Sequence, residues 1–297
     1  MIPNLELLMM VQEDADMILQ TQNSSVLFSK MTCIGLSSYD TEDASFPYWF
    51  LENVHTLEEL IVEQSCFKKI FCDKGEISEK TRTHIKTLTL SALPELQHIC
   101  EEGFQIDPVL EFLECLNVFS CPSLTNLMPS SVTLNHLTQL EIIKCNGLKY
   151  IFTTPTARSL DKLILLKIED CNSLEEIITG VENVDIAFIS LQILKLECLP
   201  RIIKFCSSKC FMKFPLLENV IVRECPRMKT FSTGSTSTPI LQKVKIAENN
   251  PKWLWKGNLN DTIYNMFKDK VCLFTTLLLV QQYNDLGFYF LLFSLDE

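Results

Sequence analysis

The stretch Leu137–Ile151 (LTQLEIIKCNGLKYI) and the stretch Leu163–Ile177 (LILLKIEDCNSLEEI) carry the same pattern of apolar residues, about 26 residues apart. Both fit the template L-x-x-L-x-[LIV]-x-x-C-x-x-L-x-x-[ILF]. In the first half of the template, apolar residues alternate with other residues, which is typical of a strand with one buried face. The second half leads away from that strand. Each copy therefore predicts a strand, a turn and a return segment.

The same register extends over most of the chain. We take the second leucine of the template as the anchor of each unit, and successive anchors lie 24 to 28 residues apart. The residues three before and two after the anchor are apolar in every unit. A template of this kind with a period of about 20 to 29 residues indicates a leucine-rich repeat, in which stacked units share one core. The anchors are Leu8, Ile34, Leu60, Leu88, Leu116, Leu140, Leu166, Leu194, Val220 and Val244.

These columns predict an α/β fold, a leucine-rich-repeat solenoid or horseshoe of about ten repeats. We expect a parallel sheet on the concave face and irregular or short helical segments on the convex face. The anchor and the residue two after it point into the core, because side chains alternate along a strand. The residue five after the anchor is expected inside, where a small side chain fits the turn. It is a cysteine in four units: Cys121, Cys145, Cys171 and Cys225.

The repeat pattern divides the chain into three parts. Residues 1–250 are predicted to form the solenoid, and residues 251–270 a C-terminal cap with a short helix at Asp261–Phe267, capped by the aspartate. Residues 271–297 form an apolar tail of uncertain structure, with two runs of about ten apolar residues separated by polar ones. A membrane-spanning helix needs about 20 consecutive apolar residues, so we consider a membrane anchor the weaker interpretation.

Composition excludes several function classes. The net charge of −11 argues against nucleic-acid binding, which needs a basic stripe. The cysteine count of 13 is odd and no signal peptide precedes the repeats, so we expect reduced thiols and a cytoplasmic protein. No phosphate-binding loop or catalytic constellation is recognisable, so we expect no enzyme activity, no catalytic residues and no cofactor. Cys206 and Cys210, near Cys198, could ligate a soft metal, but no histidine is close in sequence and we expect no metal site.

The outward strand positions remain as candidates for function. In the C-terminal half they form a charged, candidate partner-binding concave face, and in register Glu141 faces Lys167, Lys167 faces Lys195 and Glu169 faces Glu197. Like charges on neighbouring strands favour a surface completed by a protein partner. The alternative is a solvated face on which Lys167–Glu169 and Lys195–Glu197 pair within their own strands. The candidate residues are Glu141, Lys144, Lys167, Glu169, Asp170, Lys195, Glu197, Arg223, Glu224, Lys243 and Lys245.

The amino-acid sequences of the repeats are more specific than the general template. Phe46–Val62 (FPYWFLENVHTLEELIV), Leu137–Thr179 and Pro215–Ser232 (PLLENVIVRECPRMKTFS) resemble the repeat region of plant nucleotide-binding leucine-rich-repeat disease resistance proteins of the coiled-coil class. The resemblance covers roughly residues 1–270. It implies an intracellular immune receptor whose repeats sense a pathogen effector or a guarded host protein and restrain a nucleotide-binding switch. The coiled coil and the nucleotide-binding domain are missing from this sequence, so we expect only the recognition module, as in a fragment of such a receptor.

One other binding class competes with this interpretation. Leucine-rich-repeat substrate adaptors of ubiquitin ligases, the F-box class, also have cysteine-bearing repeats of similar length. They usually carry a glycine-leucine pair and a second cysteine in the return segment. Here the return segments read Leu148-Lys-Tyr-Ile151 or Leu174-Glu-Glu-Ile177, and no F-box precedes them. We therefore keep the adaptor as the alternative.

Overall fold

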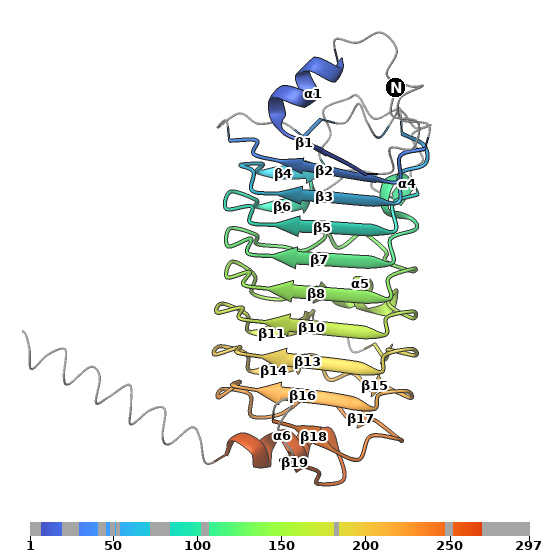
Figure 1. Ribbon diagram of the computed structural model, residues 1–297. Helices are drawn as coiled ribbons and strands as arrows, with labels where there is room; N and C mark the ends of the chain where they lie inside the picture. The colour runs from blue at the N-terminus through green and yellow to red at the C-terminus, as the bar shows by residue number, and fades with distance from the viewer. Residues whose placement is uncertain are drawn as a thin grey trace, which may run out of the picture.

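A computed structural model of the 297-residue chain contains one solenoid, built around a single large parallel sheet (Figure 1). The structure describes residues 7–19, 30–40, 46–47, 51, 54–71, 84–101, 107–180, 184–246 and 252–268. The predicted tail, residues 271–297, lies outside these described residues. Within them, no helix has the length and apolar character needed to cross a membrane.

The main sheet has eleven strands stacked in chain order along the solenoid. All pairs are parallel except the last, in which β19 runs antiparallel to β18. The turns are most regular from β3 to β16, which span about seven turns. The strands are β1 (Leu7–Met10), β2 (Cys33–Ser37), β3 (Glu59–Glu63), β5 (Thr87–Ser91), β7 (Cys115–Phe119), β8 (Gln139–Ile143), β10 (Leu165–Glu169), β13 (Ile193–Glu197), β16 (Asn219–Arg223), β18 (Val244–Lys245) and β19 (Trp253–Leu254).

The register predicted from the anchors is confirmed in every parallel pair of the main sheet. Leu8 lies opposite Ile34, Leu140 opposite Leu166, and Val220 opposite Val244, and the intervening pairs follow the same rule. In the full-length strands the anchor and the residue two after it are buried, while the residues beside them are mostly half-buried. Alternation along each strand therefore separates a core face from an outward face, as the sequence indicates.

The return path is richer in strands than the sequence predicts. Neighbouring return segments pair in three small parallel sheets: β4 (Lys69–Phe71) with β6 (His98–Cys100); β9 (Phe152–Thr153), β11 (Glu176–Thr179) and β14 (Lys204–Cys206); and β12 (Ile186–Ala187), β15 (Met212–Lys213) and β17 (Thr236–Ser237). Stacked return segments run side by side, so pairing satisfies their backbone groups. The expected helical segments are confirmed only in part, because the helices among the described residues are few and short: α1 (Gln12–Leu19), α4 (Asp107–Leu110), α5 (Thr154–Arg158) and α6 (Leu259–Phe267).

The core is one continuous apolar cluster that runs between the main sheet and the return path. A ladder of aromatic rings fills it near the C-terminal end, with Phe205 stacked on Phe231 at 4.7 Å and Phe188 stacked on Phe214 at 5.3 Å between ring centroids. All four rings are fully buried. Each ring comes from a different segment, so the ladder packs each turn against its neighbour, and a single turn has no such partner.

The turn that ends each strand has a left-handed residue four positions after the anchor. Positive φ angles between 48° and 59° occur there in eight successive units, and none of these residues is a glycine. In the seven units from Ser38 to Cys198, the backbone N–H of this residue donates to the next turn, for example from Asp170 to the carbonyl of Glu197 at 3.1 Å. This bond extends the hydrogen-bond ladder past the end of the strand. It also helps to hold the left-handed conformation, which is sterically unfavourable for residues with a Cβ atom. The residues are Ser38, Gln64, Ala92, Ser120, Lys144, Asp170, Cys198 and Glu224.

The predicted cysteine column is buried and closes this turn. The thiols of Cys121, Cys145, Cys171 and Cys225 each donate to the carbonyl two residues earlier, at 3.3 to 3.5 Å. Ser65 holds the same position in its unit, and its hydroxyl donates to the carbonyl of Glu63 at 2.8 Å. The column therefore favours a small side chain with one hydrogen to donate.

Helix α6 covers the last turn of the core. Leu259, Ile263 and Phe267 are buried in the common cluster. The helix begins two residues before the predicted start and is capped by Asn258, whose side chain accepts from the N–H of Asp261 at 2.9 Å. The predicted aspartate cap is therefore wrong: Asp261 lies inside the helix and accepts from the Asn258 amide. Asparagine fits the cap as well as aspartate does, and it starts the helix earlier.

Candidate protein-recognition surface

The outward side of the main sheet, here called the open face, carries most of the predicted site residues on adjacent strands. Glu141 lies on β8, Lys167 and Glu169 on β10, Lys195 and Glu197 on β13, Arg223 on β16 and Lys245 on β18, while Lys243 directly precedes β18. Five neighbouring strands in register, from β8 to β18, therefore bring together residues between Glu141 and Lys245 that are far apart in the sequence.

The first row on this face lies one residue after each anchor. As predicted, Glu141 lies opposite Lys167 and Lys167 opposite Lys195. The row continues through Ile221 to Lys245. Ile221 is fully buried although its position in the strand points away from the core.

The second row lies three residues after each anchor and contains an ion-pair network. Glu169 lies opposite Glu197, as predicted, and Glu197 lies opposite Arg223. Arg223 donates from Nε to Oε2 of Glu197 at 2.7 Å and from Nη2 to Oε1 of Glu169 at 3.5 Å. Its bond to Glu197 raises the pKa of Arg223 above its ordinary value, which keeps the guanidinium charged. The two facing glutamates thus share one cationic partner within the chain, and Glu197 is only 8% exposed.

The pairing within β10 that the alternative of a solvated face expects is also present, because Lys167 Nζ lies 3.2 Å from Oε2 of Glu169. Glu169 therefore bridges Lys167 and Arg223. This network was not predicted from the sequence, which considered Glu169 and Glu197 without the arginine one strand further. Fixed in this way, the side chains present a defined pattern of charge with little rotamer freedom to lose on binding.

Three predicted residues lie at the edge of the sheet instead of on its open face. Lys144, Asp170 and Glu224 occupy the left-handed turn position. Glu224 accepts from the thiol of Cys198 at 3.3 Å. Burial, reinforced by this bond, raises the pKa of Cys198 to about 12. A cleft of about 420 Å³ opens at this edge, lined by Asp170, Asn172, Cys198, Pro200, Glu224, Pro226 and Phe267.

Trp253 is a surface residue that the sequence analysis did not assign to the open face. It lies opposite Lys245 in the antiparallel β18–β19 pair, and directly opposed residues share one face of a sheet. Trp253 is 58% exposed. Large exposed aromatic side chains are frequent anchors of protein interfaces. The sequence signal was the tryptophan itself, at the point where the repeat pattern decays.

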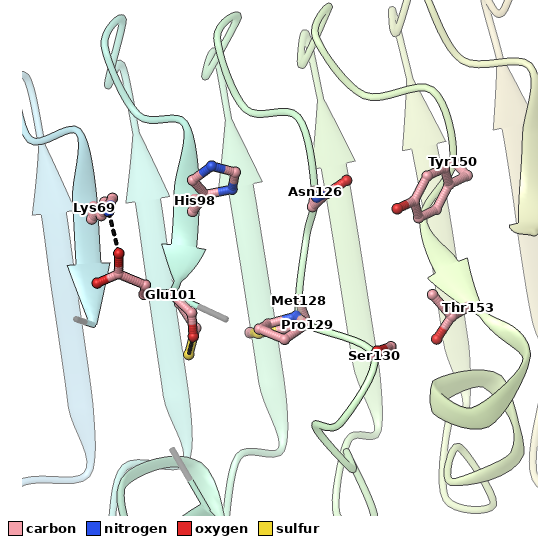
Figure 2. Close-up of a pocket in the computed structure, with 10 residues that line it drawn as sticks. Lys69, His98, Glu101, Asn126, Met128, Pro129, Ser130, Tyr150 and Thr153 are labelled. Atoms are coloured by element: carbon pink, nitrogen blue, oxygen red, sulfur yellow. Dashed lines mark hydrogen bonds and ion pairs between the residues drawn. The ribbon is translucent and has the colours of Figure 1, made fainter. Parts of the chain in front are cut away.

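A second hollow, of about 350 Å³, lies on the opposite side of the solenoid, where the return segments of four turns meet (Figure 2). Lys69 and Glu101 form an ion pair there at 2.5 Å. Along the same wall, His98, Asn126 and Tyr150 follow one another from successive turns. Among the described residues no group of three or more histidine, cysteine or acidic side chains is arranged to hold a metal ion.

Comparison with known proteins agrees with the repeat architecture. The family model described as "Plant disease resistance protein RPS2-like, leucine-rich repeats" matches residues 3–146 and 133–250. Two Arabidopsis thaliana relatives are the probable disease resistance protein At1g61310, 27% identical over 151 residues, and the probable disease resistance protein At4g27220, 25% identical over 217 residues. These regions cover 48% and 69% of this chain. No solved structure matches the chain.

The chain spans only 16% of the length of At1g61310 and 23% of At4g27220. The similarity to these relatives is therefore partial, whereas the family model covers most of the repeats. Leucine-rich repeats are non-catalytic modules that commonly bind proteins. With its anchors in register and its repeats matched from residue 3 to residue 250, the chain belongs to the RPS2-like leucine-rich-repeat family of plant disease resistance proteins.

Proposed function

We propose that this chain is the protein-recognition module of an intracellular plant immune receptor and that it acts in the cytoplasm. In this role it senses a pathogen effector or a guarded host protein, and it contacts the nucleotide-binding domain where a receptor carries one. Membership of the disease resistance family is the observation that carries the proposal. The related Arabidopsis proteins, named as probable disease resistance proteins, support the same role.

The open face from β8 to β18 is the proposed binding surface. It combines a row with Lys167, Lys195 and Lys245, a second row with Glu169 and Glu197, and the exposed Trp253 at its end. A partner that lies across these strands meets the lysine row beside the ion-pair network of Glu169, Glu197 and Arg223, which gives orientation as well as attraction. The aromatic ring supplies an apolar contact of the kind that dominates binding energy.

Affinity capture from plant leaf extract tests the proposal. The full chain serves as bait, next to a Lys167→Glu/Lys195→Glu variant of the open face and a Lys149→Glu/Lys229→Glu control, whose lysines are exposed on the return path. We expect the bait and the control to retain a common set of proteins, and the open-face variant to lose them by about tenfold or more.

Two outcomes contradict the proposal. If all three baits capture the same proteins in equal amounts, the open face is not the binding surface. If the dominant captured protein is an adaptor subunit of a ubiquitin ligase, the alternative adaptor function is favoured. Melting temperatures of the three baits, measured in parallel, separate lost binding from lost folding.

A further inference from the structure

Two thiols outside the interior cysteine column lie next to each other. Cys206 is the last residue of β14, and Cys210 follows it by four positions, just before β15. Their Sγ atoms are 3.7 Å apart, and both residues are buried. The column thiols have backbone carbonyl acceptors, whereas these two thiols hydrogen bond to each other.

Hydrogen bonds and close packing with both neighbouring turns hold the loop between the two cysteines in place. Ser207 donates to Glu176 Oε2, and Ser208 donates to the carbonyl of Gly180 at 2.6 Å. The carbonyl of Cys206 accepts from the N–H of Thr233 at 3.2 Å. Gly234 packs so closely that a Cβ there would lie 1.8 Å from the carbonyl of Cys210. Backbone contacts from the next turn therefore keep the two thiols together.

We propose that Cys206 and Cys210 form a redox-active dithiol that closes to a reversible disulfide when a peroxide reaches the loop. One thiol, as thiolate, attacks a peroxide oxygen; the O–O bond breaks, water leaves and a sulfenic acid forms. The second thiol then attacks that sulfur and releases a second water as the S–S bond forms. The pair loses two electrons and two protons, and one peroxide is reduced to two waters. This site is separate from the open face and does not depend on the proposed partner.

Formation of the disulfide would move the loop between the two cysteines as well as their sulfur atoms. A disulfide bond is about 2.05 Å long, so the Sγ atoms must approach by more than an ångström from their present separation. That movement pulls on the short segment carrying Ser207 and Ser208, which tie β14 to the neighbouring turn. Burial, followed by the neighbouring Cys206, raises the pKa of Cys210 to about 12, so we expect oxidation to be slow at neutral pH.

Peptide mapping tests the proposal directly, because Lys209 lies between the two cysteines. The folded full chain is treated with hydrogen peroxide, free thiols are alkylated in denaturant, and the protein is digested with trypsin without reduction. Cleavage gives Phe205–Lys209 (FCSSK) and Cys210–Lys213 (CFMK). We expect these two peptides to appear as one disulfide-linked species, the main disulfide of the sample, and to separate after dithiothreitol.

Matched controls make the result decisive. The peptide Cys145–Lys149 (CNGLK) carries a column thiol and should remain alkylated, not oxidised. Cys206→Ser and Cys210→Ser variants should each lose the linked species while folding as the parent does. Protein oxidised in urea should give mixed disulfides instead of this one. If folded protein yields no linked FCSSK–CFMK species, or if CNGLK is oxidised first, the proposal is overturned.

Discussion

Arg223 on β16 reaches across β13 to Glu169 on β10, while its Nε donates to Glu197 on the strand between them. One guanidinium thus bridges two carboxylates that face each other in register, and Lys167 supplies a second cation to Glu169. Because Glu197 is nearly buried, its charge depends on this partner. The open face owes its defined charge pattern to this bridge.

Replacing Arg223 by methionine should therefore destabilise the protein. The change keeps most of the side-chain volume and removes the guanidinium from the nearly buried Glu197, which then lies beside Glu169, at a cost of about 1–3 kcal/mol. Urea unfolding measures the loss. A Glu197→Gln change in the same background should restore part of it, because the buried charge is then removed. Lys243→Met, at an exposed site just before β18, is the control and should change stability by less than about 0.5 kcal/mol. Equal losses in the two variants would rule out the bridge as a stabilising contact.

At the left-handed turn positions, the effect of backbone conformation on stability can be separated from the effect of side-chain packing. Ser120 has a φ of 53°, while Ser91 ends β5 in extended conformation, and both are half-buried. Ser120→Gly should be neutral or stabilising by up to about 1 kcal/mol, because glycine adopts positive φ without a steric penalty. Ser91→Gly should be destabilising by about 0.5–1 kcal/mol, because glycine loses more entropy in a strand. Thermal melts of both variants check the sign, and two shifts of the same sign would contradict the explanation.

Much of this architecture was predictable from the sequence, and the reasons are local. The anchor columns set the register, because apolar residues with period two can face the core in only one way. Nothing in the sequence marked the left-handed column, because its residues share no side-chain type: Ala92, Lys144 and Glu224 are examples. The turn imposes this backbone conformation, and the type of side chain at the position does not indicate it.

The candidate surface was predictable only in part. Its rows followed from the register, but the bridge from Arg223 depends on a long side chain that spans two strands. Trp253 reaches the open face through an antiparallel strand that breaks the repeat. The paired return strands depend on backbone hydrogen bonds between neighbouring turns, which are not visible in the apolar pattern of one unit.

The interior thiols should make stability sensitive to high pH. Burial raises the pKa of both Cys171 and Cys225 to about 12, from an ordinary value near 9. Below pH 9 both states keep the protons, and this contribution to stability is complete. Between about pH 9 and 12 only the unfolded chain releases them, so each thiol lowers the unfolding free energy by about 1.4 kcal/mol per pH unit.

Melting temperatures measured from pH 7 to 10.5 should therefore fall above pH 9, and less steeply in a Cys171→Ala/Cys225→Ala variant. The comparison of slopes is the test, because the variant starts from a lower melting temperature at every pH. Identical slopes in the two proteins would show that these thiols ionise in the folded state. Alkylation of folded protein at pH 9 should also leave Cys171 unmodified, since its side chain is fully buried.

Asn260 connects the C-terminal helix to the last return segment, and its removal should loosen that end of the solenoid. Its Oδ1 accepts from the N–H of Ser232 at 2.8 Å, and its Nδ2 donates to the carbonyl of Gly234 at 3.2 Å. Ser232 is only 2% exposed, so Asn260→Ala leaves a buried N–H without this acceptor. We expect a loss of about 1–3 kcal/mol.

Asn265→Ala is the matched control, because Asn265 lies on the same helix and its amide donates only to the helix carbonyl of Asp261 at 2.8 Å. That change should cost well under 1 kcal/mol. Hydrogen exchange shows where the loss occurs: protection should fall in α6 and around residues 230–234 in Asn260→Ala, and stay unchanged in β5 to β8, since repeats contact mainly their neighbours. A uniform loss along the whole stack would instead mean that α6 and the solenoid unfold as one unit. Equal losses of stability in the two variants would mean that the bonds from Asn260 to Ser232 and Gly234 are not the cause.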